Sequence, residues 1–144
     1  MIIAVDFDGT LVKHEFPLIG EEVPHAFDTL RWLLSQGHDL ILWTVRIGNP
    51  LKDAVEYCER AHGIPFYGIN ENPTQKFWNG SPKAYAPLYI DDAALGCPLI
   101  HGQHHRPFVD WMRVRSLLET VFSEQNFLEK ETKEIGQRFK GALV

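Results

Sequence analysis

The sequence predicts a three-layer α/β domain built around a five-stranded parallel sheet. Two features of the chain favour this fold: short apolar runs alternate with amphipathic helical patterns, and the runs are apolar throughout. Strands that alternate with helices form parallel sheets, and unbroken apolar character is typical of strands buried on both faces. A third feature, two aspartates directly after the first run, predicts a site at the carboxyl edge of that sheet.

The expected strands are apolar runs bounded by Gly, Pro or Asp: Ile2–Val5, Asp39–Trp43, Pro65–Ile69, Leu88–Ile90 and, more weakly, Pro98–Ile100. The expected helices are apolar stripes at helical spacing: Phe27–Leu34 ending at Gly37, Leu51–Cys58 ending at Gly63, and Phe108–Phe122 with Pro107 at its start. The connections that follow Thr10 and Thr44 are too short for an inserted lid, so no cap domain is expected.

The chain has 144 residues, 44% of them hydrophobic and 23% charged, which is typical of one globular domain. Its net charge is −5 and it has no basic stripe, so broad binding to nucleic acid or to an acidic membrane is not indicated. No apolar stretch reaches the length of about 18 residues that a membrane-spanning helix needs. We therefore expect a soluble, cytoplasmic protein in which Cys58 and Cys97 are free thiols.

Residues 1–122 are expected to form the domain that carries the chemistry, and residues 123–144 a helical tail. In the tail, four apolar residues fall near one helical face among Lys and Glu: Leu128, Ile135, Phe139 and Ala142. Such a face packs either on helices of the same chain or on a second copy, so a homodimer is the alternative to an intramolecular contact.

The segment Asp6-Phe7-Asp8-Gly9-Thr10 carries the most specific signal in the chain. Two carboxylates about 4 Å apart repel each other by roughly 4 kcal/mol at an effective dielectric of about 20, so the pair needs a cation, a proton or a catalytic role. A turn at the end of a strand is the plain alternative, because Asp and Gly are favoured in turns. A calcium loop is excluded by spacing, since its glycine and closing glutamate would fall on Leu11 and Pro17.

Three other segments place polar residues at or near strand ends: Leu40–Thr44, Lys83 and Tyr89–Asp92. The carboxyl ends of parallel strands lie at one edge of the sheet, so Asp91 and Asp92 can meet Asp6 there. Each segment also has an ordinary explanation: Thr44 as a β-branched strand residue, Lys83 as a surface lysine and the aspartate pair as a helix N-cap. Their joint occurrence in this order favours phosphoryl-transfer chemistry.

In order and strand placement, these four segments resemble the four motifs of the haloacid dehalogenase-like (HAD) phosphohydrolase superfamily. The resemblance runs from Met1 to about Gly96 and is closest to small members without a cap domain. It implies a Rossmann-like, HAD-like domain with the strand order 5-4-1-2-3 and Mg²⁺ as cofactor. It also implies that Asp6 is a nucleophile that forms an aspartyl-phosphate, and that Asp8 is the general acid and base.

The resemblance assigns further roles by position. The implied metal ligands are the four carboxylates: Asp6, Asp8, Asp91 and Asp92. The implied contacts of the phosphoryl group are Gly9, Thr10, Thr44 and Lys83. These residue types suit the reaction, because carboxylate oxygens bind Mg²⁺ while hydroxyl and ammonium groups stabilise a phosphoryl transition state. Arg46 is a further candidate, able to fork onto a phosphate or a carboxylate, with a surface salt bridge as the alternative.

The predicted function is that of a Mg²⁺-dependent phosphomonoester hydrolase. Its substrate is expected to be a phosphorylated small molecule or the phosphorylated end of a larger one, with no membrane partner. The rival prediction is a catalytically silent binding or regulatory protein that kept the fold. Intact Asp6, Asp8, Lys83 and Asp91 speak against it, because a silent protein has no physical need for a cluster of repelling carboxylates.

Without a lid, selectivity is expected to come from loops at the rim of the site or from a partner subunit. The loop Asn70–Pro82 carries Phe77 and Trp78, which are expected to fold onto their own loop, with stacking on a base or sugar as the alternative. The His101–Arg106 loop is expected to be a polar rim, and a surface position is expected for His14.

Overall fold

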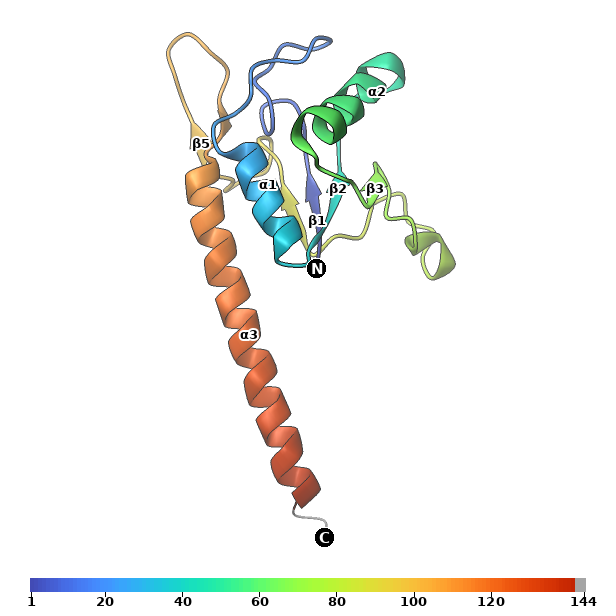
Figure 1. Ribbon diagram of the computed structural model, residues 1–144, viewed down its shortest axis with the longest axis vertical. Helices are drawn as coiled ribbons and strands as arrows, with labels where there is room; N and C mark the ends of the chain where they lie inside the picture. Colours follow the sequence, from blue (N-terminus) through green and yellow to red (C-terminus); the bar gives the residue numbers. More distant parts are fainter. Residues whose placement is uncertain (142–144) are drawn as a thin grey trace. The chain divides into compact units, whose positions relative to one another are not determined.

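The computed structural model describes the backbone of residues 1–141, the side chains of residues 1–134 and that of Gln137. Its elements, in chain order, are β1 (Ile2–Val5), α1 (Ala26–Ser35), β2 (Asp39–Leu42), α2 (Gly48–Glu56), the π-helical turn η1 (Tyr57–Ala61), β3 (Gly68–Ile69), the 3₁₀ turn η2 (Gln75–Phe77), β4 (Leu88–Ile90), β5 (Leu99–Ile100), β6 (Phe108–Val109) and α3 (Trp111–Gly141). Strands and helices alternate up to β3, and η2 lies between β3 and β4, so the α/β class predicted from the sequence is confirmed (Figure 1).

The main sheet has four parallel strands in the order β3-β2-β1-β4, which is the order expected for the first four strands (Figure 1). In the central strand β1, Val5 lies opposite Leu42 of β2 on one side and Ile90 of β4 on the other. Every residue of β1 and β2 after the first is buried, which explains their unbroken apolar sequences. This register brings the carboxyl ends of β2, β1 and β4 side by side at one edge.

The prediction of a fifth strand in this sheet is wrong. β5 pairs in antiparallel fashion with β6 in a separate two-stranded sheet, with Leu99 opposite Val109. The apolar pattern predicts a helix from Phe108, but Phe108 and Val109 form β6, and α3 begins at Trp111. The physical reason is that Phe108 and Val109 pair with β5 through their main chain. The Val109 N–H also donates a 2.9 Å hydrogen bond to the Gly9 carbonyl.

Helix α1 ends where the glycine signal in the sequence predicts. Phe27, Leu30 and Leu33 share its buried face. Gly37 has a φ of 79°, a left-handed conformation that suits glycine, and its N–H bonds the Leu34 carbonyl at 3.0 Å. The chain then turns directly into β2, so that α1 connects two adjacent parallel strands.

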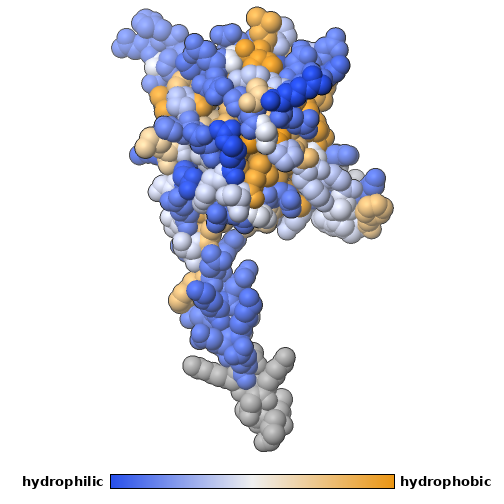
Figure 2. All heavy atoms as spheres, in the orientation of Figure 1, coloured by the Kyte–Doolittle hydropathy of each residue, from blue (hydrophilic) through white to orange (hydrophobic). Residues whose placement is uncertain are grey.

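The chain divides into two compact units, residues 1–111 and 112–144. The first unit contains both sheets and all the candidate site residues. The described part of the second unit is helical, and its side chains from 123 to 134 are exposed and largely hydrophilic (Figure 2). Leu128 is 60% exposed, whereas Ile135, Phe139 and Ala142 of the predicted apolar face have side chains outside the described residues. Within the described part of the chain, no helix combines the length and apolar character of a membrane span.

Candidate active site

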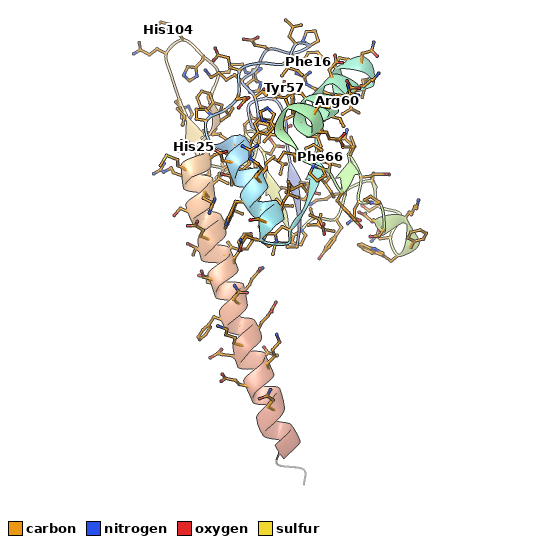
Figure 3. All side chains as sticks on the ribbon, viewed as in Figure 1. Phe16, His25, Tyr57, Arg60, Phe66 and His104 are labelled. Atoms are coloured by element: carbon orange, nitrogen blue, oxygen red, sulfur yellow. The ribbon has the colours of Figure 1, made fainter. Side chains whose placement is uncertain are left out.

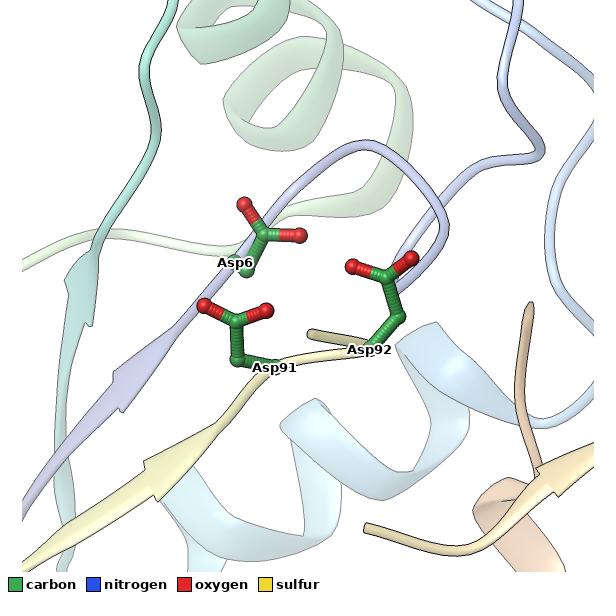
Figure 4. Close-up of side chains that lie close together, drawn as sticks. All are labelled: Asp6, Asp91 and Asp92. Carbon is green, nitrogen blue, oxygen red and sulfur yellow. The ribbon is translucent and has the colours of Figure 1, made fainter. Parts of the chain in front are cut away.

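Three carboxylates meet at the carboxyl edge of the main sheet (Figure 4). Asp6 follows β1, and Asp91 and Asp92 follow β4; the Asp6 N–H donates to the Ile90 carbonyl at 2.9 Å, so the pairing of the strands continues to this edge. One oxygen from each carboxylate lies within 4.8 Å of the other two. Carboxylate oxygens at this spacing suit a divalent cation such as Mg²⁺. The structure therefore brings together three of the four predicted metal ligands.

The surroundings of Asp6 disfavour its charged form. Burial is the largest cause, and the negative charges of Asp91 and Asp92 add to it, so that the pKa of Asp6 rises from 3.8 to about 7. Hydrogen bonds from the Phe7 N–H and the Thr10 hydroxyl oppose this rise in pKa. A cation between the three carboxylates would offset both the lost hydration and the repulsion. The residues present therefore fit a bound metal ion.

Thr10 joins the two chain segments that carry the carboxylates. Its hydroxyl donates to Asp6 Oδ2 at 2.9 Å and accepts from the Asp92 N–H at 3.2 Å. The Thr10 carbonyl accepts a 2.7 Å bond from the indole Nε1–H of Trp111, and both residues are buried. In this arrangement the Thr10 hydroxyl positions Asp6, whereas the sequence predicts it as a phosphate contact.

His14 belongs to the site, so its expected surface position is wrong. His14 Nε2 lies 2.9 Å from Asp92 Oδ2, and the two side chains are only 15% and 18% exposed. Gly9 leaves room for this pair: its φ is 82°, and a Cβ there would lie 2.2 Å from His14 Nε2 and 2.4 Å from Asp92 Oδ2. Sequence reasoning misses the pair because its members are 78 positions apart and a lone histidine carries no periodic signal.

Asp8 is not part of the group of three carboxylates, because Arg46 binds both of its oxygens. The guanidinium donates from Nε to Oδ2 at 2.7 Å and from Nη2 to Oδ1 at 2.6 Å, and the arginine side chain is fully buried. Further bonds run from Nη1 to the Pro17 carbonyl at 3.0 Å and from Nη2 to the Leu18 carbonyl at 2.7 Å. The fork predicted for Arg46 is thus formed with a carboxylate, and its nitrogens are engaged within the protein.

Burial of the Arg46 side chain leaves its neighbours exposed at the rim of the site. Val45 and Ile47 are 95% and 78% exposed. The Phe16 ring, in the loop after β1 (Figure 3), lies 5.3 Å from the guanidinium carbon and is also largely exposed. The rim on this side is therefore apolar. His104 marks the polar loop between β5 and β6 (Figure 3), whose residues 101–106 are all exposed.

A pocket of about 200 Å³ lies next to the carboxylates. It is lined by six residues: Asp6, Trp43, Thr44, Val45, Asn70 and Asp91. The Thr44 N–H donates to Asn70 Oδ1 at 2.7 Å, and the Thr44 hydroxyl accepts from the Arg46 N–H at 3.2 Å. Thr44 therefore stands beside Asp6, where its place at the end of a parallel strand predicts it. No sequence motif predicts Asn70.

Lys83 lies near the aromatic ring of Tyr89 in β4. Its Nζ is 5.7 Å from the centre of that ring. Lys83 makes no ion pair with any carboxylate in the described part of the chain. Gln75 holds its backbone by donating from Nε2 to the Lys83 carbonyl at 2.8 Å.

The loop after β3 is organised by amides rather than by its aromatic residues. Asn72 and Gln75 are nearly fully buried and bond the loop backbone, including the carbonyl and the N–H of Tyr85 at 2.9 and 2.6 Å. Phe77 and Trp78 are 80% and 58% exposed, so the expectation that they fold onto their own loop is wrong. The physical reason is that buried amides satisfy the backbone of an irregular loop, which apolar rings cannot do.

Together, fold and site define an α/β protein with a carboxylate cluster at the carboxyl edge of its parallel sheet. The chain is similar to the solved structure of a conserved protein from Bacteroides thetaiotaomicron, at 42% sequence identity over 83% of this chain and 90% of that chain, with a TM-score of 0.69. At this identity and coverage, the chain belongs to the same protein family as that conserved protein. No protein-family model and no curated protein matches the chain significantly.

Proposed function

We propose that the protein is a HAD-like, Mg²⁺-dependent phosphomonoester hydrolase that acts through an aspartyl-phosphate on Asp6. One observation carries the proposal: three carboxylates converge at the carboxyl edge of a parallel sheet, where burial and mutual repulsion raise the pKa of Asp6 to about 7. Such a cluster destabilises a fold, because partly buried like charges repel each other. A site that binds a cation and a phosphoryl group accounts for it.

Asp6, Asp91 and Asp92 would hold the ion, since their oxygens are close enough to share it. Bound Mg²⁺ would neutralise negative charge on the carboxylates and on the phosphoryl group. The side chain of Asp8, first predicted as a fourth ligand, is assigned no metal contact, because Arg46 engages both of its oxygens.

The chain's own residues then divide the reaction between them. Asp6 attacks phosphorus, the bond to the leaving oxygen breaks, and Asp8 gives that oxygen a proton, which it carries on a lone pair not used by its two bonds to Arg46. Water next attacks the phosphorus of the aspartyl-phosphate and gives a proton to Asp8, which restores Asp6 and releases inorganic phosphate. Thr44 and Lys83 stabilise the non-bridging oxygens, over which negative charge is spread in the transition state.

The proposed substrate is a phosphorylated small molecule or the phosphorylated end of a larger one. A substrate can reach the carboxylates directly, because the chain folds no separate unit between β1 and β4 within residues 1–111. A cytoplasmic location belongs to the same proposal, and it agrees with the free thiols of Cys58 and Cys97.

Hydrolysis of p-nitrophenyl phosphate, with and without Mg²⁺, tests this function. Wild-type protein is expected to show Mg²⁺-dependent turnover, and Asp6→Asn is expected to show none. Asp53→Asn, the control, alters an exposed aspartate of α2 and is expected to turn over substrate at the wild-type rate. Mass spectrometry of Asp8→Asn, which keeps the nucleophile but lacks the base, is expected to find phosphate on Asp6. Equal residual rates in wild type and Asp6→Asn would favour a catalytically silent binding protein instead.

A further inference from the structure

Asn70 occupies an unusual backbone conformation directly beside the carboxylates. It follows β3 with a φ of 53°, in the left-handed region that non-glycine residues seldom adopt. Asparagine is among the residues that tolerate this region best, and such conformations cluster at functional sites. Asn70 also lines the 200 Å³ pocket together with Asp6 and Thr44.

The orientation of the Asn70 amide follows from its partner. The Thr44 N–H can only donate, so the atom that accepts its 2.7 Å bond must be the side-chain oxygen Oδ1. The other end of the amide is therefore the Nδ2 group with its two N–H donors. Among the described residues, nothing accepts a hydrogen bond from Nδ2.

We propose that Asn70 Nδ2 donates a hydrogen bond to a non-bridging oxygen of the phosphoryl group, beside Thr44. The inference rests on the proposed function, because that function supplies the phosphoryl ligand. The pocket needs such a donor, because its lining contains two carboxylates and no cationic side chain, and the nearby Arg46 is engaged by Asp8. A neutral amide can bind an anionic oxygen and, unlike a cationic side chain, forms no salt bridge with Asp6 or Asp91.

A purely structural role is the competing explanation, since Asn70 also accepts from Thr44 and holds a left-handed backbone. Asn70→Asp separates the two roles. Aspartate has the same shape, tolerates the same φ and keeps an oxygen for the Thr44 N–H, but it replaces Nδ2 with an oxygen that repels phosphate. Asn79→Asp is the matched control, because Asn79 Oδ1 also accepts a backbone N–H, from Ser81 at 2.8 Å, on an exposed loop outside this pocket.

Binding of orthovanadate, a mimic of the phosphoryl transition state, is measured in the presence of Mg²⁺ by isothermal titration calorimetry, together with kcat/KM for p-nitrophenyl phosphate. Loss of one such donor typically lowers a rate by about 10²–10³-fold, so Asn70→Asp is expected to lose at least about tenfold in orthovanadate affinity and in kcat/KM. Asn79→Asp is expected to stay within about twofold and to keep the wild-type melting temperature. Asn70→Asp is expected to remain folded, with a melting temperature lowered by the charge that it adds beside Asp6 and Asp91.

Wild-type orthovanadate affinity in Asn70→Asp would overturn the inference, and so would absence of orthovanadate binding in the wild type. An equal loss of orthovanadate affinity in Asn70→Asp and Asn79→Asp would likewise overturn it, because Asn79 lies outside the pocket. Failure of the proposed function is distinguishable from these outcomes. It would appear as wild-type protein that binds orthovanadate through Asn70 but turns over no phosphomonoester.

Discussion

The Arg46 guanidinium donates two parallel hydrogen bonds, at 2.7 and 2.6 Å, to the two oxygens of Asp8. Asp8 lies in the loop after β1 and Arg46 in the loop after β2, and the same guanidinium bonds the carbonyls of Pro17 and Leu18. One buried side chain therefore joins three stretches of chain around the site. Bidentate pairing also fixes the direction of the Asp8 carboxylate.

Arg46→Met is expected to lower the free energy of unfolding by about 3–5 kcal/mol, because it leaves the Asp8 charge without its buried partner. Urea unfolding measures the change. Arg31→Met is the control: Arg31 pairs with Asp28 on α1, but these side chains are 47% and 74% exposed. Loss of such a surface pair is expected to cost less than about 1 kcal/mol. A similarly small loss for Arg46→Met would contradict the assigned role.

Gly9→Ala is expected to destabilise the protein more than Gly37→Ala does. Both glycines have left-handed backbones, with φ of 82° and 79°, so both substitutions incur the cost of about 1–2 kcal/mol for an L-residue in this region. Only at Gly9 would the added Cβ also collide with His14 and Asp92, whereas nothing lies within 4 Å at Gly37. Thermal unfolding compares the two variants, and equal losses would argue against the close packing of His14 on Asp92.

Asp6→Asn is expected to stabilise the metal-free protein at pH 8 and to leave its stability nearly unchanged at pH 4. The pKa of Asp6 is raised from 3.8 to about 7, so the folded protein binds this proton more tightly than the unfolded chain does. The stability that Asp6 contributes is therefore full below pH 3.8 and declines as the pH rises to about 7. Asparagine cannot ionise and escapes this decline, which amounts to at most about 4 kcal/mol.

Urea unfolding in EDTA at several pH values measures this difference. Asp53→Asn serves as the control for loss of one exposed charge, and its stability relative to wild type is expected to vary little with pH. A difference between Asp6→Asn and wild type that stays constant from pH 4 to pH 8 would show that Asp6 titrates normally.

Mg²⁺ is expected to raise the melting temperature of the wild-type protein, because the proposed ion would bind the converged carboxylates of the folded state and not the dispersed ones of the unfolded chain. A ligand at 100 times its Kd stabilises by about 2.7 kcal/mol. Asp91→Asn is expected to weaken this response and the activity together. Lys83→Ala is expected to lower activity alone, since Lys83 lies over Tyr89 and outside the carboxylate group. A melting temperature indifferent to millimolar Mg²⁺ would count against the metal site.

The sequence predicts those parts of the fold that depend on local periodicity. The four strands of the main sheet, the end of α1 at Gly37 and the meeting of Asp6 with Asp91 all follow from apolar runs and the residues that end them. The place of Leu99–Ile100 does not follow, because an apolar run predicts a strand but not the sheet to which it belongs. Phe108 fits either a helix or a strand by its spacing, and pairing across the hairpin decides between them.

The side chains that sequence reasoning misses are those whose partners are distant in the chain. His14 reaches Asp92 across 78 positions, and Asn70 reaches Thr44 across 26. Neither residue belongs to a periodic pattern, so its role emerges only when the strand ends are brought together. Arg46 could be predicted only in part. A two-pronged contact with an anion follows from the guanidinium itself, but its partner, the Asp8 carboxylate rather than a phosphate, is set by how the loops fold.

The carbonyls of Gly9 and Thr10 are held by donors from much later in the chain, Val109 at 2.9 Å and Trp111 at 2.7 Å. A fragment that stops at Gly96 would contain every residue assigned to the reaction and would lack both donors. Two buried carbonyls would then lose their partners, at a cost of about 1–3 kcal/mol each. The proposed activity is therefore expected to need the chain as far as Trp111, although the residues after Gly96 include none of those assigned to the reaction.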